Sequence, residues 1–283
     1  MAQQFTNQAQ LSFNNTVISS NVAVGEIRDV LSLEKTALQA TYTVGDHLTY
    51  AVSMTNSGAA PLTDLTLTDD LGTFTDDTGT YTPLTFTEGT LRYFQNGVEQ
   101  PLTPVEKAVP LTVNGLTVPA GGNVLILYEA TVNGLANPTD GSSITNTVTV
   151  SGTGIAPLTA SYTVTVTSGP VLSINKTISP VPVAQNGTVT YTFVIENAGN
   201  ADATESDSLS ITDTFNPLLS DLVVTYNGNT WEETTNYTYD AVTGLFTTVP
   251  GGITVPAATF TRGTDGTWGV TPGSATVTVS GTI

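Results

Sequence analysis

Three polar residues, Lys35, Asp69 and Asn146, lie on faces that the sequence otherwise reserves for apolar side chains. Alternation with period two is typical of a half-buried β-strand. It places Lys35 with Leu31 and Leu33, Asp69 with Leu65 and Leu67, and Asn146 with Ile144, Val148 and Val150. Each residue alone also fits an ordinary role, as a snorkelling lysine, a turn aspartate or an asparagine bonded to local backbone. All three together suggest a shared use, because burying an unpaired charge is costly.

A buried amine, carboxyl and amide can form a bond between side chains. Desolvation lowers the pKa of a lysine and makes a neutral nucleophilic amine available. Desolvation also raises the pKa of a carboxyl, which can then hydrogen-bond to the amide and polarise its carbonyl. Folding holds the reacting groups together. We therefore predict an isopeptide bond between Lys35 and Asn146 with loss of ammonia, assisted by Asp69 or, as the less favoured choice, Asp70. The bond requires the first and last strands of the domain to be neighbours.

The elements that must position these residues are short strands. Thr, Val, Gly and Asn dominate, and turn pairs such as Asn96-Gly97 and Asn227-Gly228 separate alternating runs. The 283 residues are enough for two domains with separate cores. We predict an all-β fold of two immunoglobulin-like sandwiches in tandem, 28–168 and 169–283, that meet near Ser168-Gly169-Pro170.

An internal repeat supports this division. Leu31–Thr36 matches Leu172–Thr177, and Thr49-Tyr50 matches Thr190-Tyr191 at the same offset. At a slightly larger offset, the run that ends at Asp69 matches Leu209–Asp213. The second repeat therefore carries Lys176 and Asp213 as counterparts of Lys35 and Asp69, and we expect both to face its core.

Several runs carry a resemblance to a known family. They are Leu31-Ser32-Leu33-Glu34-Lys35-Thr36, Gly45-Asp46 with Thr49-Tyr50, Thr68-Asp69-Asp70-Leu71 and Ile144-Thr145-Asn146-Thr147. The chain resembles the conserved repeat domain of Gram-positive surface proteins, known as domain of unknown function eleven, and subunits of clostridial spore appendages. The resemblance implies an immunoglobulin-like sandwich, often with a Lys-Asn isopeptide bond, that builds surface stalks or spore appendages. Two departures are the absence of a cell-wall sorting signal and a second repeat without its asparagine.

The last run of the second repeat has two alignments. Pro272–Val279 aligns with Pro119–Leu127, the penultimate strand of repeat one, which we favour. Alternatively, Thr276–Thr282 aligns with the identical Thr147–Thr153, and Ala275 then replaces Asn146. Under either alignment the asparagine is missing, and under the first we expect domain 169–283 to lack its last strand.

Residues 1–27 contain the missing pattern. Phe5-Thr6-Asn7-Gln8-Ala9 matches Ile144–Val148 and places Asn7 on the apolar face. A second run, Ser19–Ile27, follows a turn at Asn14-Asn15, which predicts a hairpin. This hairpin precedes repeat one as the hairpin Ile144–Thr167 precedes repeat two.

We therefore predict that residues 1–27 complete the second repeat of a neighbouring copy by donating a strand. Asn7 would then bond to Lys176 with help from Asp213. Such a head-to-tail contact builds an open homopolymer unless it closes into a ring. The alternatives are a frayed terminus or an arm that folds back onto its own second repeat.

Composition excludes several function classes. Six Lys and Arg against 24 Asp and Glu give a net charge of -18, which argues against nucleic acid and anionic membranes as partners. There is no cysteine, and His47 is the only histidine. We therefore expect no enzyme, metal site, cofactor or small-molecule substrate. A signal-peptide pattern and a membrane-spanning run are also absent.

These observations predict a structural subunit of an extracellular fibre at a cell or spore surface. The rival interpretation is a monomeric adhesive or ligand-binding stalk module, for which acidic loops or Trp231 and Trp268 would form the site.

Overall fold

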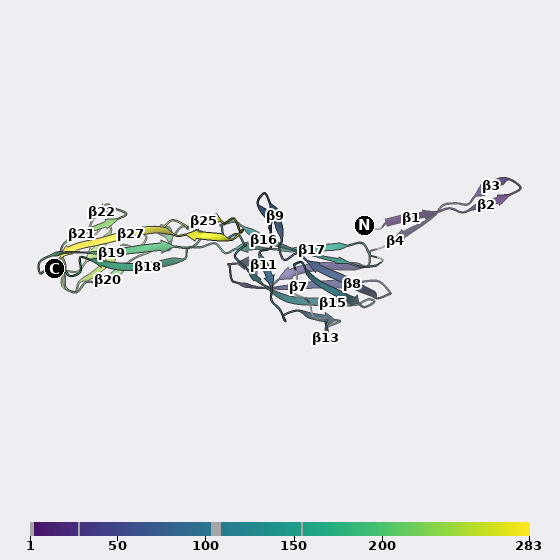
Figure 1. The fold of residues 1–283 in the computed structure, drawn as a ribbon, viewed down its shortest axis with the longest axis horizontal. Helices are drawn as coiled ribbons and strands as arrows, with labels where there is room; N and C mark the ends of the chain where they lie inside the picture. Colours follow the sequence, from purple (N-terminus) through teal and green to yellow (C-terminus); the bar gives the residue numbers. More distant parts are fainter. Residues whose placement is uncertain (1–2, 28, 103–108, 154) are drawn as a thin grey trace. The chain divides into compact units, whose positions relative to one another are not determined.

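The computed structural model of the chain describes residues 3–27, 29–102, 109–153 and 155–283. Strands dominate this part, and its only helical segment is a 3-10 turn at Glu205–Asp207 (Figure 1). The chain divides into two compact units, unit 1 with residues 1–133 and 144–164 and unit 2 with residues 134–143 and 165–283. The expected all-β fold of two immunoglobulin-like sandwiches preceded by a hairpin is confirmed.

One segment groups differently from the predicted domain 28–168. Residues 134–143 belong to unit 2, because their carbonyls bond to it: Gly134 O accepts from Trp268 N at 3.2 Å, and Pro138 O accepts from Asn200 Nδ2 at 2.9 Å. The predicted arm 1–27 and the domain start at 28 include residues 1, 2 and 28, which lie outside the described residues.

Unit 1 is a sandwich of two sheets. The first has the order β13-β12-β15-β7-β5, and β11 also pairs with β15. Its strands are β5 (Leu31–Ala37), β7 (His47–Asn56), β11 (Leu84–Phe86), β12 (Arg92–Gln95), β13 (Val98–Gln100) and β15 (Asn123–Val132). The second sheet has the order β14-β8-β16-β17-β6. It contains β6 (Thr41–Tyr42), β8 (Leu62–Asp69), β14 (Leu111–Val118), β16 (Ser143–Ser151) and β17 (Leu158–Val166). A small hairpin, β9 (Phe74–Asp76) and β10 (Gly79–Tyr81), is separate.

Alternation on the central strands builds the core of unit 1. Every second residue of β7 and β15 is buried, namely Leu48, Tyr50, Val52 and Met54 on β7 and Val124, Ile126, Tyr128, Ala130 and Val132 on β15. The strand pattern of period two is what makes one face of each strand apolar. The same period carries Lys35 and Asn146 onto the inner faces of β5 and β16.

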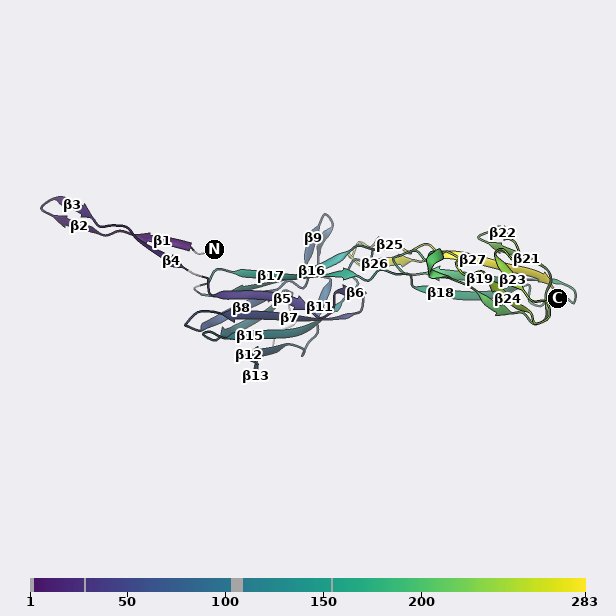
Figure 2. The same ribbon diagram turned by 180° about the vertical axis from the view of Figure 1, so that it is seen from behind.

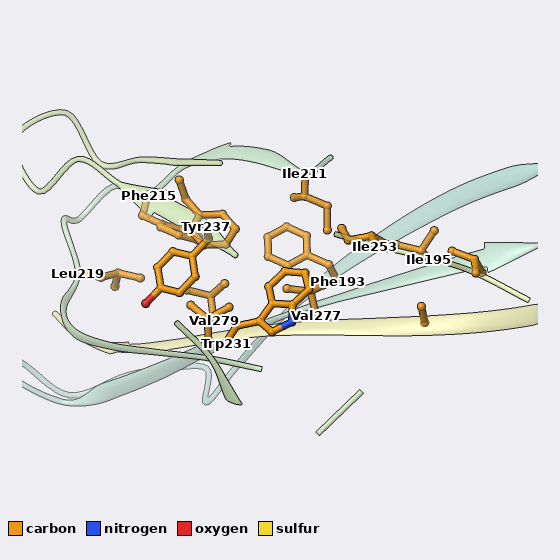
Figure 3. Close-up of a cluster of buried hydrophobic side chains, with 14 of the residues drawn as sticks. Phe193, Ile195, Ile211, Phe215, Leu219, Trp231, Tyr237, Ile253, Val277 and Val279 are labelled. Atoms are coloured by element: carbon orange, nitrogen blue, oxygen red, sulfur yellow. The ribbon is translucent and has the colours of Figure 1, made fainter. Parts of the chain in front are cut away.

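Unit 2 has a corresponding first sheet, in the order β18-β19-β27-β21-β22. The strands are β18 (Leu172–Ser179), β19 (Thr188–Asn197), β21 (Ser220–Tyr226), β22 (Asn229–Trp231) and β27 (Gly273–Thr282). The second sheet, β20-β24-β23, contains β20 (Thr212–Thr214), β23 (Tyr237–Tyr239) and β24 (Leu245–Thr248). A hairpin of β25 (Thr259–Arg262) and β26 (Trp268–Thr271) completes the unit. Aromatic side chains, among them Phe193, Phe215 and Trp231, fill the core together with Val277 and Val279 (Figure 3).

The register identifies the last strand of unit 2. β15 lies between β7 and β12, with Tyr128 opposite Tyr50, and β27 lies between β19 and β21, with Val279 opposite Tyr191. β27 therefore corresponds to β15 and not to β16. The favoured alignment of Pro272–Val279 with Pro119–Leu127 agrees with this pairing of strands, although in the structure Val279 takes the place of Tyr128 and not of Leu127.

The second sheets of the two units differ at one edge. β8 pairs with β14 on one side and with β16 on the other. β20, which carries Asp213, pairs with β24, and within the described residues its other edge has no strand. The position that β16 fills in unit 1 is therefore open in unit 2.

The N-terminal arm is a hairpin (Figure 2). β1 (Gln3–Asn7) pairs with β4 (Ala23–Ile27), and β2 (Gln10–Phe13) pairs with β3 (Thr16–Ser19). Asn14 and Asn15 both have positive φ, of 48° and 61°, as a two-residue hairpin turn of the primed type requires. Seven large apolar side chains of the arm are 50–66% exposed; they are Phe5, Leu11, Phe13, Val17, Ile18, Val22 and Val24. The arm thus has the strand pairing of a sheet, and these side chains form no buried core.

Candidate functional site

The structure brings together the three residues predicted for unit 1. Lys35 projects from β5 in the first sheet and contacts Asp69, at the end of β8 in the second sheet, which also carries Asn146 on β16. Lys35 Nζ donates a hydrogen bond to Asp69 Oδ2, and neither side chain is exposed to solvent. Asn146 is also fully buried. β5, the first strand of the sandwich, and β16, which carries Asn146, thus contribute to one site, while the Lys35–Asn146 bond itself stays a prediction.

A fourth residue, Tyr128 of β15, links the three. Its hydroxyl donates to Asp69 Oδ2 at 2.6 Å and accepts from Lys35 Nζ and from Asn146 Nδ2, each at 3.0 Å. The connection from Asp69 to Asn146 therefore runs through the tyrosine hydroxyl. The sequence analysis missed Tyr128. The available signal was a polar hydroxyl on the face of β15 that Val124, Ile126 and Ala130 make apolar.

The two neighbouring aspartates have different roles. Asp69 Oδ1 accepts from Leu71 N at 3.0 Å, which leaves Oδ2 for the lysine and the tyrosine. Asp70 Oδ1 accepts from Gly72 N at 2.8 Å and from Thr147 N at 2.9 Å. Asp70 thus ties the end of β8 to the strand that carries Asn146. Of the two candidates, Asp69 is the one that contacts the amine.

Burial of the site favours the neutral forms of the Lys35 amine and the Tyr128 phenol. Burial lowers the pKa of Lys35 below 10.5, although the charge of Asp69 and its hydrogen bond act in the opposite direction. Burial raises the pKa of Tyr128 well above 10, and the charge of Asp69 adds to this rise. The phenol therefore keeps its proton, while the amine loses its proton more readily than a lysine in water. Nucleophilic attack on an amide needs a neutral amine, which this lowered pKa of Lys35 favours.

Tyr50 completes the walls of the site. Its ring stacks on Tyr128 with centroids 5.4 Å apart, and Lys35 Nζ lies 4.9 Å from the Tyr50 centroid. The Tyr50 hydroxyl and Asn146 Oδ1 are both buried without a hydrogen-bond partner of good geometry. Burial raises the pKa of Tyr50, and its proximity to Asn146 opposes that rise. An amide oxygen without a partner in a dry site is uncommon in folded proteins.

The second predicted pair is formed but not buried. Lys176 Nζ on β18 bonds to Asp213 Oδ2 on β20, and their side chains are 40% and 20% exposed. The expectation that both face the core was met only in part, because the two side chains stay accessible to solvent. The ammonium lies over aromatic rings, 4.7 Å from the Tyr191 centroid and 5.5 Å from that of Phe215. The pair is accessible because the position that β16 fills in unit 1 is open.

Exposure along β18 shows the extent of the uncovered area. Leu31 on β5 is 6% exposed, whereas its counterpart Leu172 is 41% exposed. Ile174 and Ile178 on β18 are 58% and 44% exposed. Asn7, the predicted partner of Lys176, is exposed on β1 opposite Ala23 and makes none of the contacts described for Lys176 or Asp213.

Other classes of site find no support in the described part of the chain. It contains no group of three or more His, Asp or Glu side chains that could hold a metal ion. None of its helices is long and apolar enough to cross a membrane.

Comparison with known proteins gives structural likenesses only. No protein-family model matches the chain, and no curated protein matches it. The resemblance to the conserved repeat domain therefore stays a prediction.

Among solved structures, the major pilin subunit BcpA of Bacillus cereus is 14% identical with a TM-score of 0.37, over 95% of this chain and 73% of the pilin. The pilus backbone RrgB of Streptococcus pneumoniae is 14% identical with a TM-score of 0.34, over 90% of this chain and 50% of RrgB. The collagen-binding domain of a Staphylococcus aureus adhesin is 14% identical with a TM-score of 0.30, over 47% of this chain and 95% of that domain. At these scores we derive no function from the likenesses.

Proposed function

We propose that the chain is a structural subunit of an extracellular fibre, in which the arm of one copy completes unit 2 of the next. The observation that carries the proposal is the open edge of β20, where unit 1 has β16. An unpaired edge beside exposed apolar side chains is a template for another strand. The exposed residues Leu172 and Ile174 supply the apolar surface that such a strand would cover.

The arm matches what the open edge lacks. In unit 1 the edge of β8 is filled by a hairpin, β16 and β17, whose strands are joined by Thr145 Oγ1 and Thr163 Oγ1 at 2.8 Å. The arm is also a hairpin, and β1 has the sequence pattern of β16, with Asn7 in the place of Asn146. Seated in the same way, β1 would cover β18 with its apolar face and direct Asn7 toward Lys176 and Asp213.

Repetition of this contact makes a polymer. The arm and the open edge are different surfaces, so the contact is heterologous and leaves a free arm at one end and a free edge at the other. Unless the rotation closes a ring, subunits add head to tail. We assign the fibre to a cell or spore surface, and the proposal needs no cofactor, metal or small-molecule substrate.

Isopeptide bonds would stabilise the fibre. In each, the lysine Nζ bonds to the asparagine Cγ, the bond from Cγ to Nδ2 breaks, and ammonia leaves. The Lys35–Asn146 bond would form within unit 1. The Asn7–Lys176 bond, assisted by Asp213, would join neighbouring subunits.

Three forms of the chain test the proposal: the intact chain, a chain without residues 1–27, and Asn7→Ala. We expect the intact chain to lengthen with concentration in light scattering and electron microscopy, and the shortened chain to stay monomeric. Asn7→Ala should assemble but lose the ladder, which is the series of covalently joined oligomers that survives boiling in detergent and is seen in denaturing electrophoresis. Thr6→Ala, next to Asn7 on the opposite face of β1, is the matched control and should keep the ladder. An intact chain that stays monomeric at every concentration would instead favour the adhesive or ligand-binding stalk module.

A further inference from the structure

The hydroxyl of Tyr128 contacts all three reacting groups of unit 1. It lies 3.0 Å from Lys35 Nζ, 2.6 Å from Asp69 Oδ2 and 3.0 Å from Asn146 Nδ2. Tyr128 is 1% exposed, so no water is required to connect these groups. Asp69, which receives the proton of the attacking amine, is linked through this oxygen to the nitrogen that must leave.

We propose that Tyr128 is a catalytic residue that carries a proton from Asp69 to the leaving nitrogen of Asn146. This inference rests on the proposed Lys35–Asn146 bond and adds the route by which its proton travels. A leaving amide nitrogen must be protonated, because an amide anion is a poor leaving group. The tyrosine hydroxyl already contacts that nitrogen, from which it accepts a hydrogen bond before the reaction.

The step balances with the groups present. Starting from a neutral Lys35 amine and an Asp69 carboxylate, the Nζ lone pair attacks Cγ, and the carbonyl pair moves to Oδ1. Nζ then gives a proton to Asp69 Oδ2. Asp69 passes a proton to the Tyr128 oxygen while Tyr128 gives its own proton to Nδ2. The pair on Oδ1 re-forms the carbonyl as the bond from Cγ to Nδ2 breaks, ammonia leaves, and both Asp69 and Tyr128 return to their starting states. Nothing is oxidised or reduced.

Unit 2 provides an internal contrast. In unit 1, Tyr128 lies opposite Tyr50 on the neighbouring strand. In unit 2, Tyr191 corresponds to Tyr50, and the residue opposite Tyr191 is Val279. Val279 is fully buried and has no hydroxyl to offer. A bond formed at Lys176 would therefore proceed without this relay. The relay belongs to unit 1, where amine and amide are parts of one folded domain.

The test follows bond formation in the full chain. Protein kept in denaturant from synthesis is refolded by dilution, and the loss of one ammonia is timed by intact mass. We expect Tyr128→Phe to fold, as judged by near-ultraviolet circular dichroism, and to form the bond at least roughly 10²-fold more slowly. The matched control is Tyr93→Phe, which removes another hydroxyl of unit 1, one that bonds to Thr117 backbone atoms away from the site. It should form the bond at the wild-type rate.

A solvent isotope measurement separates a relay from mere packing. The wild-type rate should fall in deuterium oxide with a curved dependence on deuterium fraction, because two protons move together, and Tyr128→Phe should lose the curvature. If Tyr128→Phe does not fold, the wild-type curve alone decides, and a linear dependence contradicts the relay. A folded Tyr128→Phe that bonds at the wild-type rate overturns the relay but leaves the bond intact. A wild type that loses no ammonia overturns both.

Discussion

A lysine ammonium in a protein core is unfavourable unless its charge is paired or removed. Asp69 Oδ2 supplies the first remedy by accepting a hydrogen bond from Lys35, and the proposed bond to Asn146 would supply the second. The rings of Tyr50 and Tyr128 add a weaker attraction, at 4.9 and 5.6 Å from Nζ. Bond formation would convert a titratable core group into a neutral amide. At the residue scale, the free energy of unfolding should therefore depend on pH through Lys35 only while its amine is free.

The first prediction concerns Asn146→Ala, which keeps the free amine. Burial lowers the pKa of Lys35, so between that lowered pKa and 10.5 the unfolded chain binds one proton more than the native chain. The free energy of unfolding should then rise with pH across this window, by at most about 1.4 kcal/mol per pH unit. Wild type with the bond should lack this slope. Denaturant unfolding at a series of pH values measures it, and parallel profiles would show that Lys35 is not a free buried amine in the variant.

The second prediction separates the two aspartates. Asp69→Asn should abolish bond formation and, because it leaves Lys35 buried without its counter-charge, destabilise unit 1 by about 3–5 kcal/mol. Asp70→Ala removes the acceptor for Gly72 N and Thr147 N. It should cost about 1–3 kcal/mol and still allow the bond. Denaturant unfolding and intact mass give the two readouts. Loss of the bond in Asp70→Ala alone would reverse the assignment.

At the scale of elements, alternation predicted the site of unit 1 because a strand places every second side chain on one face. That rule assigned Lys35, Asp69 and Asn146 to one core, and it equally assigned Lys176 and Asp213 to another. It failed for the second pair because alternation says which way a residue faces and not whether a strand covers it. Tyr128 was missed for a related reason, since an aromatic residue on an apolar strand is interpreted as packing.

The proposed assembly pairs two elements, the hairpin of the arm and the open edge of β20. Asn14-Asn15 predicted the turn of the arm because both residues tolerate positive φ. The place of the last strand could not be fixed from the sequence, since two alignments preserved its alternation. The register of β27 against β19 resolves it. This assignment leaves the edge of β20 as the position for β1.

The third prediction uses the apolar face of β1. Phe5 and Asn7 share that face, and Phe5 is 54% exposed. Phe5→Asp should prevent assembly, because a carboxylate would be buried against β18 when the strand seats. Thr6→Asp adds the same charge on the other face and should assemble nearly as wild type. Sedimentation velocity at matched concentration measures both. Equal loss of assembly in the two variants would point to charge repulsion between copies. Normal assembly of both variants would contradict burial of this face of β1 against β18.

At the scale of the whole molecule, subunits of the proposed fibre could not be joined by disulfides, because the chain has no cysteine. A net charge of -18 adds repulsion between copies, which weakens an association held by strand pairing alone. Covalent closure of each junction would make the fibre insensitive to dilution. The two proposed bonds differ in timing, since one needs only folding and the other needs a second copy.

The fourth prediction is an order of events. The Lys35–Asn146 bond should form as unit 1 folds, with Tyr128 in place, and assembly should follow by strand pairing. The Asn7–Lys176 bond should form last, because two copies must first meet in a bimolecular step. It should also be slow because Val279 replaces the relay tyrosine. Samples taken during refolding should therefore lose one ammonia first, scatter light next and show a boiling-resistant ladder only later. Raising the protein concentration should shorten the delay before scattering but leave the first mass loss unchanged. A ladder that appears together with the first mass loss would show that the Asn7–Lys176 bond forms as early as the Lys35–Asn146 bond. The Tyr128 relay would then give the bond within unit 1 no advantage in rate.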